Sequence, residues 1–241
     1  MSSARARPRR RGGFAGFLRR VILWLTALVI LIVLVPYGLV FAYIPSSVHP
    51  VSTLMLADLV TGHRYVRNWV PFDKIDPVLV ESVMMSEDSR FCEHGGVDWQ
   101  ALGHVIDKTL AGDTDRGAST IPMQTVKNLF LWPSHSYIRK ALEIPLALYA
   151  DAIWSKRRTM ELYLNVAEWS PGIYGIGAAA QFLYGTSADK LTRRQAALLA
   201  VTLPDPDDRN PSAPSHELRK LASTIVARAR NSGPYIKCLY P

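Results

Sequence analysis

Residues 77–96, PVLVESVMMSEDSRFCEHGG, change abruptly from apolar to charged. In the first part, apolar residues stand on both sides of single polar ones, a pattern that predicts a largely buried helix. The last eleven residues hold three carboxylates, a histidine, an arginine and a thiol. Because such groups are costly to bury, this part is either a solvated helix end and turn or a site of chemistry.

Glu87 directly follows the apolar part of this segment. A carboxylate at such a boundary is partly desolvated, which raises its pKa and suits it to proton transfer. Taken alone, an acidic pair such as Glu87 and Asp88 is more often a plain helix end in solvent. No metal-binding spacing is satisfied around His94, since one histidine and scattered acids do not make a zinc site.

The positive charge of the chain is concentrated at its start. The formal net charge is +8, but seven arginines precede residue 21 and no acidic residue occurs before Asp58. Without those arginines the chain has 21 basic and 20 acidic residues. A basic arm could bind nucleic acid, but the segment that follows argues for a membrane instead, and we expect no nucleic-acid partner.

Residues 21–43, VILWLTALVILIVLVPYGLVFAY, contain no charged side chain. About 20 apolar residues suffice to cross a bilayer as a helix, whereas a cleavable signal peptide has a shorter apolar region of roughly 7–15 residues. The arginines place the N-terminal side in the cytoplasm, because positive charge is retained there. We therefore predict a cytoplasmic basic tail (1–20), a transmembrane helix (21–43) and an external remainder.

The external part reads as a short connection followed by one mainly α-helical domain. Residues 44–76 mix polar residues with short apolar pieces and predict a linker with one weak hairpin, and residues 77–241 show helical periodicity between Gly, Pro and Ser breakers. Pro145 lies within the helical pattern of residues 137–154 and predicts a kink or a restart. Cys92 and Cys238 could pair outside the cytoplasm, but two unpaired thiols are the simpler expectation.

A second group of polar residues occurs in residues 116–128, RGASTIPMQTVKN. Gln124, Lys127 and Asn128 are spaced i, i+3 and i+4, which places two amides and a cation on one helical face. Such a face suits phosphate groups and sugar hydroxyls. The segment lacks the GKS or GKT ending of a nucleotide-binding P-loop.

A third group is RKALE, residues 139–143. Arg139 and Lys140 precede Glu143 by four and three residues, so both cations can flank one carboxylate on a helix. In isolation, this arrangement is most simply a surface ion pair, which contributes little to stability.

The order of the motifs is more informative than any one of them. EDSRFCEHGGVD, GASTIPMQTVKNLFLW, RKALE, KRRTMELYLNVAEW and GIYGIGAAAQFLYG follow one another along the chain. Together they closely resemble the glycosyltransferase domain of bacterial peptidoglycan polymerases, glycosyltransferase family 51, which also occurs in class A penicillin-binding proteins. More narrowly, the chain resembles the monofunctional biosynthetic peptidoglycan transglycosylases. The resemblance covers roughly residues 50–230 and is firmest over residues 81–185.

The resemblance implies a mainly helical, lysozyme-like fold and polymerisation of lipid II into β-1,4-linked glycan. The reaction would invert the donor anomeric carbon and release undecaprenyl diphosphate. It implies a periplasmic catalytic domain attached to the inner (cytoplasmic) membrane by one span. The expected partners are lipid II, the growing glycan chain, the membrane and other cell-wall synthesis or division proteins. No cofactor is required by the sequence, although a divalent cation, Mg²⁺ or Mn²⁺, could assist the pyrophosphate.

The resemblance also assigns roles to individual residues. Glu87 matches the catalytic base of the family, and Glu143 is the second catalytic candidate, which would orient the neighbouring cations or help hold a divalent ion. Residues 156–165 match a motif that reads as scaffold, through Lys156, Glu161, Tyr163 and Asn165. The expected substrate-binding residues are Asp88, Phe91, His94, Gly95, Ser119, Thr120, Gln124, Lys127, Asn128, Arg139 and Lys140.

The chain departs from the family pattern at three positions. Pro122 and Met123 stand where the family usually has Ser or Thr followed by a glutamine, and Gly177 stands where many relatives have an acid. The lost glutamine removes an amide expected on the donor side. Two alternatives therefore stay open, a lysozyme-like enzyme that cleaves peptidoglycan and an inactive lipid II-binding scaffold at the membrane. Because Glu87 and the cationic motifs are present, we expect activity.

Overall fold

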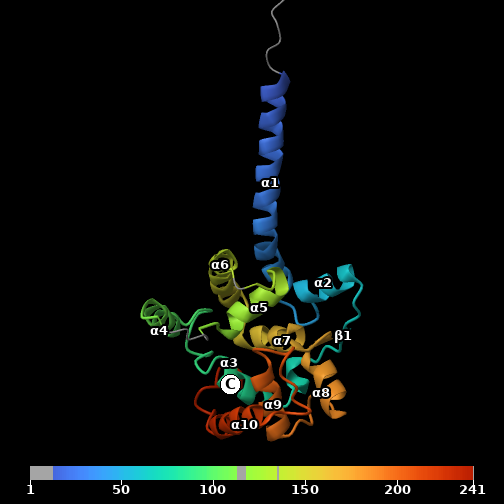
Figure 1. The fold of residues 1–241 in the computed structure, drawn as a ribbon, viewed down its shortest axis with the longest axis vertical. Helices are drawn as coiled ribbons and strands as arrows, with labels where there is room; N and C mark the ends of the chain where they lie inside the picture. Colours follow the sequence, from blue (N-terminus) through green and yellow to red (C-terminus); the bar gives the residue numbers. More distant parts are fainter. Residues whose placement is uncertain (1–12, 113–117, 135, 241) are drawn as a thin grey trace, which may run out of the picture. The chain divides into compact units, whose positions relative to one another are not determined.

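The computed structural model describes residues 13–112, 118–134 and 136–240. Its contacts divide the chain into two compact units, Met1–Leu39 and Val40–Pro241, which are described separately below. Over the described residues the structure contains ten α-helices and a small three-stranded sheet (Figure 1). The mainly α-helical class predicted from the sequence is therefore confirmed.

The first unit consists of most of helix α1, Gly13–Ala42. Residues 14–42 are long and apolar enough to cross a membrane, and only 6% of the most apolar window is buried. A core helix of a soluble protein would have these side chains covered. Pro36 lies inside the helix, which continues through it. The predicted transmembrane segment is thus a helix whose length and composition fit a membrane anchor.

The second unit begins with a segment that is bound to the domain and is not a loose linker. Trp154 Nε1 donates a hydrogen bond to Val40 O (2.8 Å), and Arg158 donates to Tyr43 O (2.9 Å) and Val48 O (2.6 Å). Helix α2, Thr53–Thr61, then begins after the N-cap Ser52 and ends at a left-handed glycine. The apolar pieces of this region were too short to show helical periodicity.

The hairpin expected in residues 44–76 is wrong. Strand β1, Val66–Arg67, pairs in parallel with β3, Ile173–Tyr174, and β2, Glu168–Ser170, pairs antiparallel with the other edge of β3. The partner of β1 lies more than a hundred residues away, so the local sequence could not indicate it. A 3₁₀ helix, Phe72–Lys74, leads from β1 into the first core helix.

Helix α3, Pro77–Glu87, confirms the buried helix predicted from the opening segment. The Asp76 side chain accepts a hydrogen bond from Val78 N (2.9 Å), and Pro77 occupies the first turn, where its missing N–H costs nothing. Helix α3 packs against α9, Arg193–Thr202, and α10, His216–Ala229. Its last residue is Glu87, so the carboxylate lies at the end of a buried helix, at the edge of the hydrophobic core.

The other helices form the rest of the domain. Helix α5, Ile121–Phe130, packs against α6, Tyr137–Ile153, and against α7, Lys156–Val166. In the view of Figure 1, α7 is drawn between α5 and α3. The remaining elements are α4, Trp99–Leu110, and α8, Ile176–Tyr184. Helix α6 does not restart at Pro145, and buried residues on both sides of the proline hold it in one piece.

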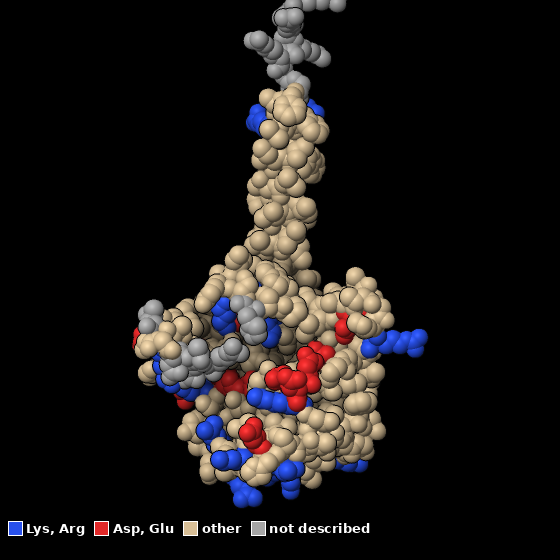
Figure 2. Space-filling view, in the orientation of Figure 1, with Lys and Arg blue, Asp and Glu red and all other residues tan. Residues whose placement is uncertain are grey.

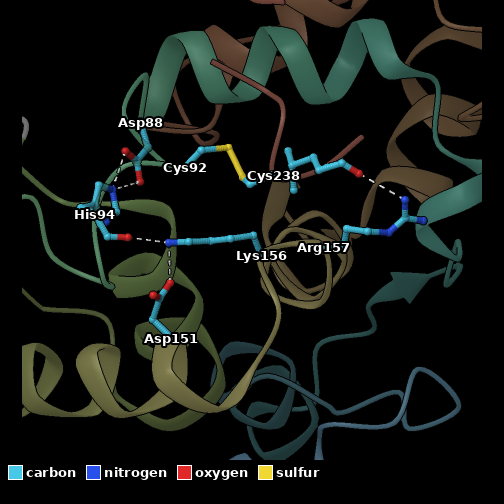
Figure 3. The surroundings of a disulfide bond; sticks show 8 residues. Asp88, Cys92, His94, Asp151, Lys156, Arg157 and Cys238 are labelled. Carbon is cyan, nitrogen blue, oxygen red and sulfur yellow. Dashed lines mark hydrogen bonds and ion pairs between the residues drawn. A yellow bond between two sulfur atoms is a disulfide. The ribbon is translucent and has the colours of Figure 1, made fainter. Parts of the chain in front are cut away.

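A disulfide bond joins Cys92 to Cys238, which corrects the expectation of two unpaired thiols (Figure 3). The two Cα atoms are 5.6 Å apart, although 146 residues separate them in the sequence. The C-terminal segment is held further by Arg157 Nη1, which donates to Leu239 O (3.2 Å). The loop that follows Glu87 is therefore covalently tied to the C-terminal segment.

Replacement of both cysteines by serine should lower the free energy of unfolding by about 2–5 kcal/mol, because the bond closes a very long loop and so restricts the unfolded chain. The measurement is denaturant unfolding of the full chain in detergent, with and without a reductant. The reductant should destabilise the native protein and leave the double variant unchanged. Equal stabilities of native and variant protein would contradict the expected contribution of the bond.

Candidate active site

Glu87 is held at the end of α3 by two hydrogen bonds. Ser86 Oγ donates to its Oε1 (3.1 Å), and Gln124 Nε2 donates to its Oε2 (3.1 Å). Burial raises the pKa of Glu87, and the two hydrogen bonds together with the charges of Arg209 and Lys127 oppose that rise. A partly desolvated carboxylate that still ionises is the state required of a general base.

Two cavities are lined by Glu87 and by its hydrogen-bond partner Gln124, respectively. Glu87 and Ser119 line the smaller one, of about 210 Å³, and Gln124, which contacts Glu87, lines the larger one, of about 550 Å³. The larger cavity is lined by two cations, Lys127 and Arg139, and by carboxylates at residues 168, 205 and 207. In the space-filling view, acidic and basic side chains lie close together on the face of this unit that is shown (Figure 2).

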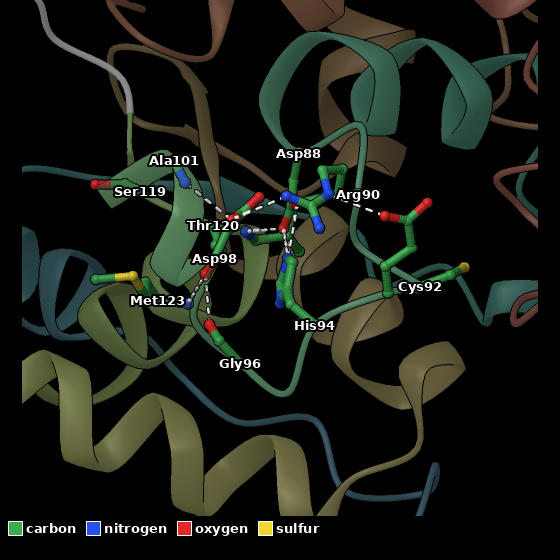
Figure 4. A network of polar contacts seen from close by, with 12 residues as sticks. Asp88, Arg90, Cys92, His94, Gly96, Asp98, Ala101, Ser119, Thr120 and Met123 are labelled. Carbon is green, nitrogen blue, oxygen red and sulfur yellow. Dashed lines mark hydrogen bonds and ion pairs between the residues drawn. The ribbon is translucent and has the colours of Figure 1, made fainter. Parts of the chain in front are cut away.

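Asp88 links the loop after α3 to the start of α5 (Figure 4). Its Oδ2 accepts a hydrogen bond from Ile121 N (2.9 Å), and His94 Nε2 lies 2.9 Å from its Oδ1. Thr120, the N-cap of α5, donates to Gly96 O (2.6 Å) and accepts from Met123 N (3.3 Å). These contacts connect the first and second motifs predicted from the sequence and fix Gln124 relative to Glu87.

Two residues predicted to bind substrate, Phe91 and His94, line neither of these two cavities. Phe91 is fully buried, and its ring contacts the Lys156 ammonium at 4.7 Å. Lys156 also donates to His94 O (2.7 Å) and Asp151 Oδ1 (2.7 Å; Figure 3). Phe91 and His94 therefore fix the loop that follows Glu87 through their contacts with Lys156. Asn128 is largely buried and lines the larger cavity.

The third motif forms a buried charge cluster. The two oxygens of Glu143 accept hydrogen bonds from Arg139 Nη1 and from Lys140 Nζ (2.8 Å for the lysine). Lys140 also donates to Ser119 Oγ (2.8 Å). Burial lowers the pKa of the neighbouring Lys127, and the charge of Glu143 opposes that effect. One carboxylate thus holds two cations, and with Lys127 the cluster keeps a net positive charge that suits an anionic group.

The residues of this cluster do not fit a divalent cation. A hard cation needs several oxygen ligands with free lone pairs, and both oxygens of Glu143 are already occupied by cationic donors. Among the described residues, no group of three or more His, Cys, Asp or Glu side chains is placed to hold a metal. Glu143 therefore orients Arg139 and Lys140, the first of its two expected roles.

Two contacts of the site were not indicated by the sequence. Tyr163, expected to be scaffold, donates from its hydroxyl to Gln124 Oε1 (3.0 Å). Glu168 lines the larger cavity, accepts from Gly172 N (2.9 Å), and has a pKa raised by burial. Both residues lie far from Glu87 in the sequence, so only the motif around them could have drawn attention to them.

The family departures lie in packed surroundings. Met123 is fully buried in the protein core. A Cβ atom at Gly177 would overlap Asn68 O and lie 2.7 Å from Val70 Cγ2. Asn165 fixes that neighbouring segment, since its side chain accepts from Val70 N (2.7 Å) and donates to Val70 O (2.9 Å). An acid at position 177 is thus excluded by the close approach of residues 68–70.

Gly96 is the conformationally constrained glycine of this loop, whereas its neighbour Gly95, expected to bind substrate, is exposed. Gly96 has a φ of +90°, and a Cβ there would lie 2.6 Å from Ala147 O, whereas nothing lies within 4 Å of a Cβ at Gly95. Gly96→Ala should therefore destabilise the protein by about 2–4 kcal/mol, and Gly95→Ala by no more than about 0.5 kcal/mol. Thermal unfolding of the two variants checks this, and equal effects would contradict it.

Comparison with known proteins identifies the family. The transglycosylase family model matches residues 54–230. A biosynthetic peptidoglycan transglycosylase of Rhizobium leguminosarum bv. trifolii is 57% identical over 97% of this chain and 99% of its own length. A protein of the same name from Rhizobium meliloti is 59% identical over 90% of this chain and 92% of its own length. Another, from Brucella suis, is 55% identical over 91% of this chain and 98% of its own length. The chain belongs to the transglycosylase family, which confirms the resemblance drawn from its motifs.

Proposed function

We propose that this peptidoglycan glycosyltransferase polymerises lipid II into β-1,4-linked glycan and releases undecaprenyl diphosphate. The observation that carries the proposal is the pairing of Glu87 with the charge cluster. A desolvated carboxylate stands at one end of the site, and Gln124 connects it to a cavity walled by Lys127 and Arg139. One end can take a proton, and the other can stabilise negative charge.

Glu87 acts as the general base in this proposal. The 4-hydroxyl of the acceptor GlcNAc loses its proton to Glu87 as its oxygen attacks C1 of the donor MurNAc. The bond from C1 to the pyrophosphate breaks, and its electron pair leaves with the phosphate oxygen. Direct attack from the opposite face converts the α-linked donor into a β-linked product. No covalent enzyme intermediate is required.

Lys127, Arg139 and Lys140 stabilise the charge that develops on the leaving pyrophosphate. Because Glu143 is buried and holds Arg139 and Lys140 in place, these cations are oriented before the reaction starts. We propose that the protein supplies this stabilisation through its own cations. A divalent cation in the site would have to be held by the phosphate oxygens of the substrate. A peptidoglycan hydrolase has no pyrophosphate to stabilise and no use for this cluster.

The proposed location is the inner membrane, with the N-terminus in the cytoplasm and the catalytic domain in the periplasm. Helix α1 has the length and composition of a single span, and the arginines precede it. The Cys92–Cys238 disulfide supports an oxidising compartment for the catalytic domain. On α2, Leu56, Leu59 and Val60 are more than half exposed, which suits contact with a lipid interface. Association with other cell-wall synthesis or division proteins stays a prediction.

Glu87→Gln should reduce the rate of glycan formation by about 10²- to 10⁴-fold, because the amide keeps the shape of the side chain but cannot accept the proton. The measurement is polymer formation from lipid II by the purified full chain in detergent. Glu93→Gln is the matched control, since Glu93 lies in the same loop, is half exposed and pairs only with Arg90 among the described residues. Full activity of Glu87→Gln would exclude Glu87 as the base.

Lys127→Met should lower kcat by about 10²- to 10³-fold, the cost of removing one group that stabilises transition-state charge. The exposed Lys220 on α10 provides the control, because Lys220→Met removes the same charge away from both cavities. Steady-state kinetics with lipid II separates the two parameters. A raised KM with an unchanged kcat would show that Lys127 only binds the ground state.

A further inference from the structure

Tyr163 lies on α7 with its side chain buried, and its hydroxyl is directed at Gln124. The hydroxyl donates to Gln124 Oε1 (3.0 Å), and Gln124 Nε2 in turn donates to Glu87 Oε2 (3.1 Å). Two hydrogen bonds therefore connect the scaffold helix α7 to the proposed base. The mechanism described above does not use Tyr163.

The two ends of the Gln124 amide are chemically different, since the oxygen only accepts hydrogen bonds and the nitrogen only donates them. Desolvation holds the pKa of Tyr163 well above its usual value, so the phenol keeps its proton and remains a donor. A donor at this place satisfies the amide oxygen. The amide nitrogen is then left to face Glu87, and its hydrogen bond is stronger to the ionised carboxylate than to the protonated acid.

We propose that Tyr163 is a positioning residue for Glu87, because its hydroxyl fixes the side-chain amide of Gln124 with the nitrogen towards the carboxylate. The inference rests on the proposed role of Glu87 as the base. Once Glu87 has taken a proton it becomes a donor, and a free amide would turn its oxygen to meet it. Tyr163 opposes that rotation, so Gln124 offers no acceptor for the O–H of the protonated form, and release of the proton for the next cycle is favoured.

The contact between Tyr163 and Gln124 matters more in this chain because Met123 replaces a glutamine of the family pattern. The resemblance implies two adjacent glutamines here, but this chain has only Gln124, and the side chain at position 123 is buried in the core. Among the described residues, Glu87 receives side-chain hydrogen bonds from Gln124 and Ser86 alone. The orientation of one amide therefore decides whether Glu87 keeps its second donor.

Tyr163→Phe tests the proposal through the pH profile of glycan formation. Without the Tyr163 hydroxyl the Gln124 amide is free to rotate, which weakens its hydrogen bond to the ionised form of Glu87 by about 1 kcal/mol. The pKa of Glu87 should then rise, and the acid limb of kcat/KM should move to higher pH by about 0.5–1 unit. The rate above that limb should stay within about threefold. Tyr184→Phe is the control, because it deletes a hydroxyl bonded to Pro211 O (3.1 Å) and should not move the limb.

A second measurement reads Glu87 without relying on turnover. The side-chain carboxyl resonance of Glu87, identified by its absence in Glu87→Gln, is titrated in the full chain labelled with ¹³C-glutamate. Tyr163→Phe should shift this titration in the native protein and cause no further shift in a Gln124→Leu background, because the effect passes through Gln124. An unshifted titration, or the same shift in both backgrounds, overturns the proposal.

The two proposals can fail separately. If Glu87→Gln stays active, the proposed base is wrong and the inference about Tyr163 falls with it. If Glu87→Gln is inactive while Tyr163→Phe lowers the rate equally at every pH, the proposed function stands and Tyr163 is only structural. Melting temperatures of the variants separate a loss of folded protein from a change in the site.

Discussion

The active-site geometry depends on the buried carboxylate of Asp88. A buried charge is tolerated only with hydrogen-bond partners, and Asp88 finds them in His94 and in the first N–H of α5, a donor that the helix itself leaves unpaired. Because Asp88 directly follows Glu87, this one contact sets the proposed base against the helix that carries Gln124 and Lys127. The Thr120 cap and the Cys92–Cys238 bond hold the same loop from two further directions.

Burial acts in opposite directions on the two ends of the site, and the neighbours decide how far each effect goes. Desolvation raises the pKa of Glu87 and lowers that of Lys127. Hydrogen bonds from Gln124 and Ser86 oppose the rise of the Glu87 pKa, and the charge of Glu143 opposes the fall of the Lys127 pKa. At both ends of the site the neighbours thus favour the charged form that desolvation opposes, and electrostatic interactions are stronger where water is excluded.

The features predicted correctly from the sequence are local ones. The apolar pattern of residues 77–87 predicted helix α3, and the long uncharged segment of residues 21–43 predicted helix α1. The spacing of RKALE placed Arg139 and Lys140 on Glu143 within one helix. The features that were missed join distant segments, as the Cys92–Cys238 bond and the contact of Tyr163 with Gln124 do. Sequence spacing carries no information on such contacts, because only the packing of the folded chain brings the partners together.

The same packing accounts for the three departures from the family pattern. Pro122 occupies the first turn of α5, where a proline fits without losing a hydrogen bond, and Met123 fills the core beneath it. Gly177 faces the backbone of Asn68, where a larger side chain would collide. All three substitutions exchange groups that pack against protein. Gln124, which contacts Glu87, and Lys127 and Arg139, which line the larger cavity, are all present in this chain.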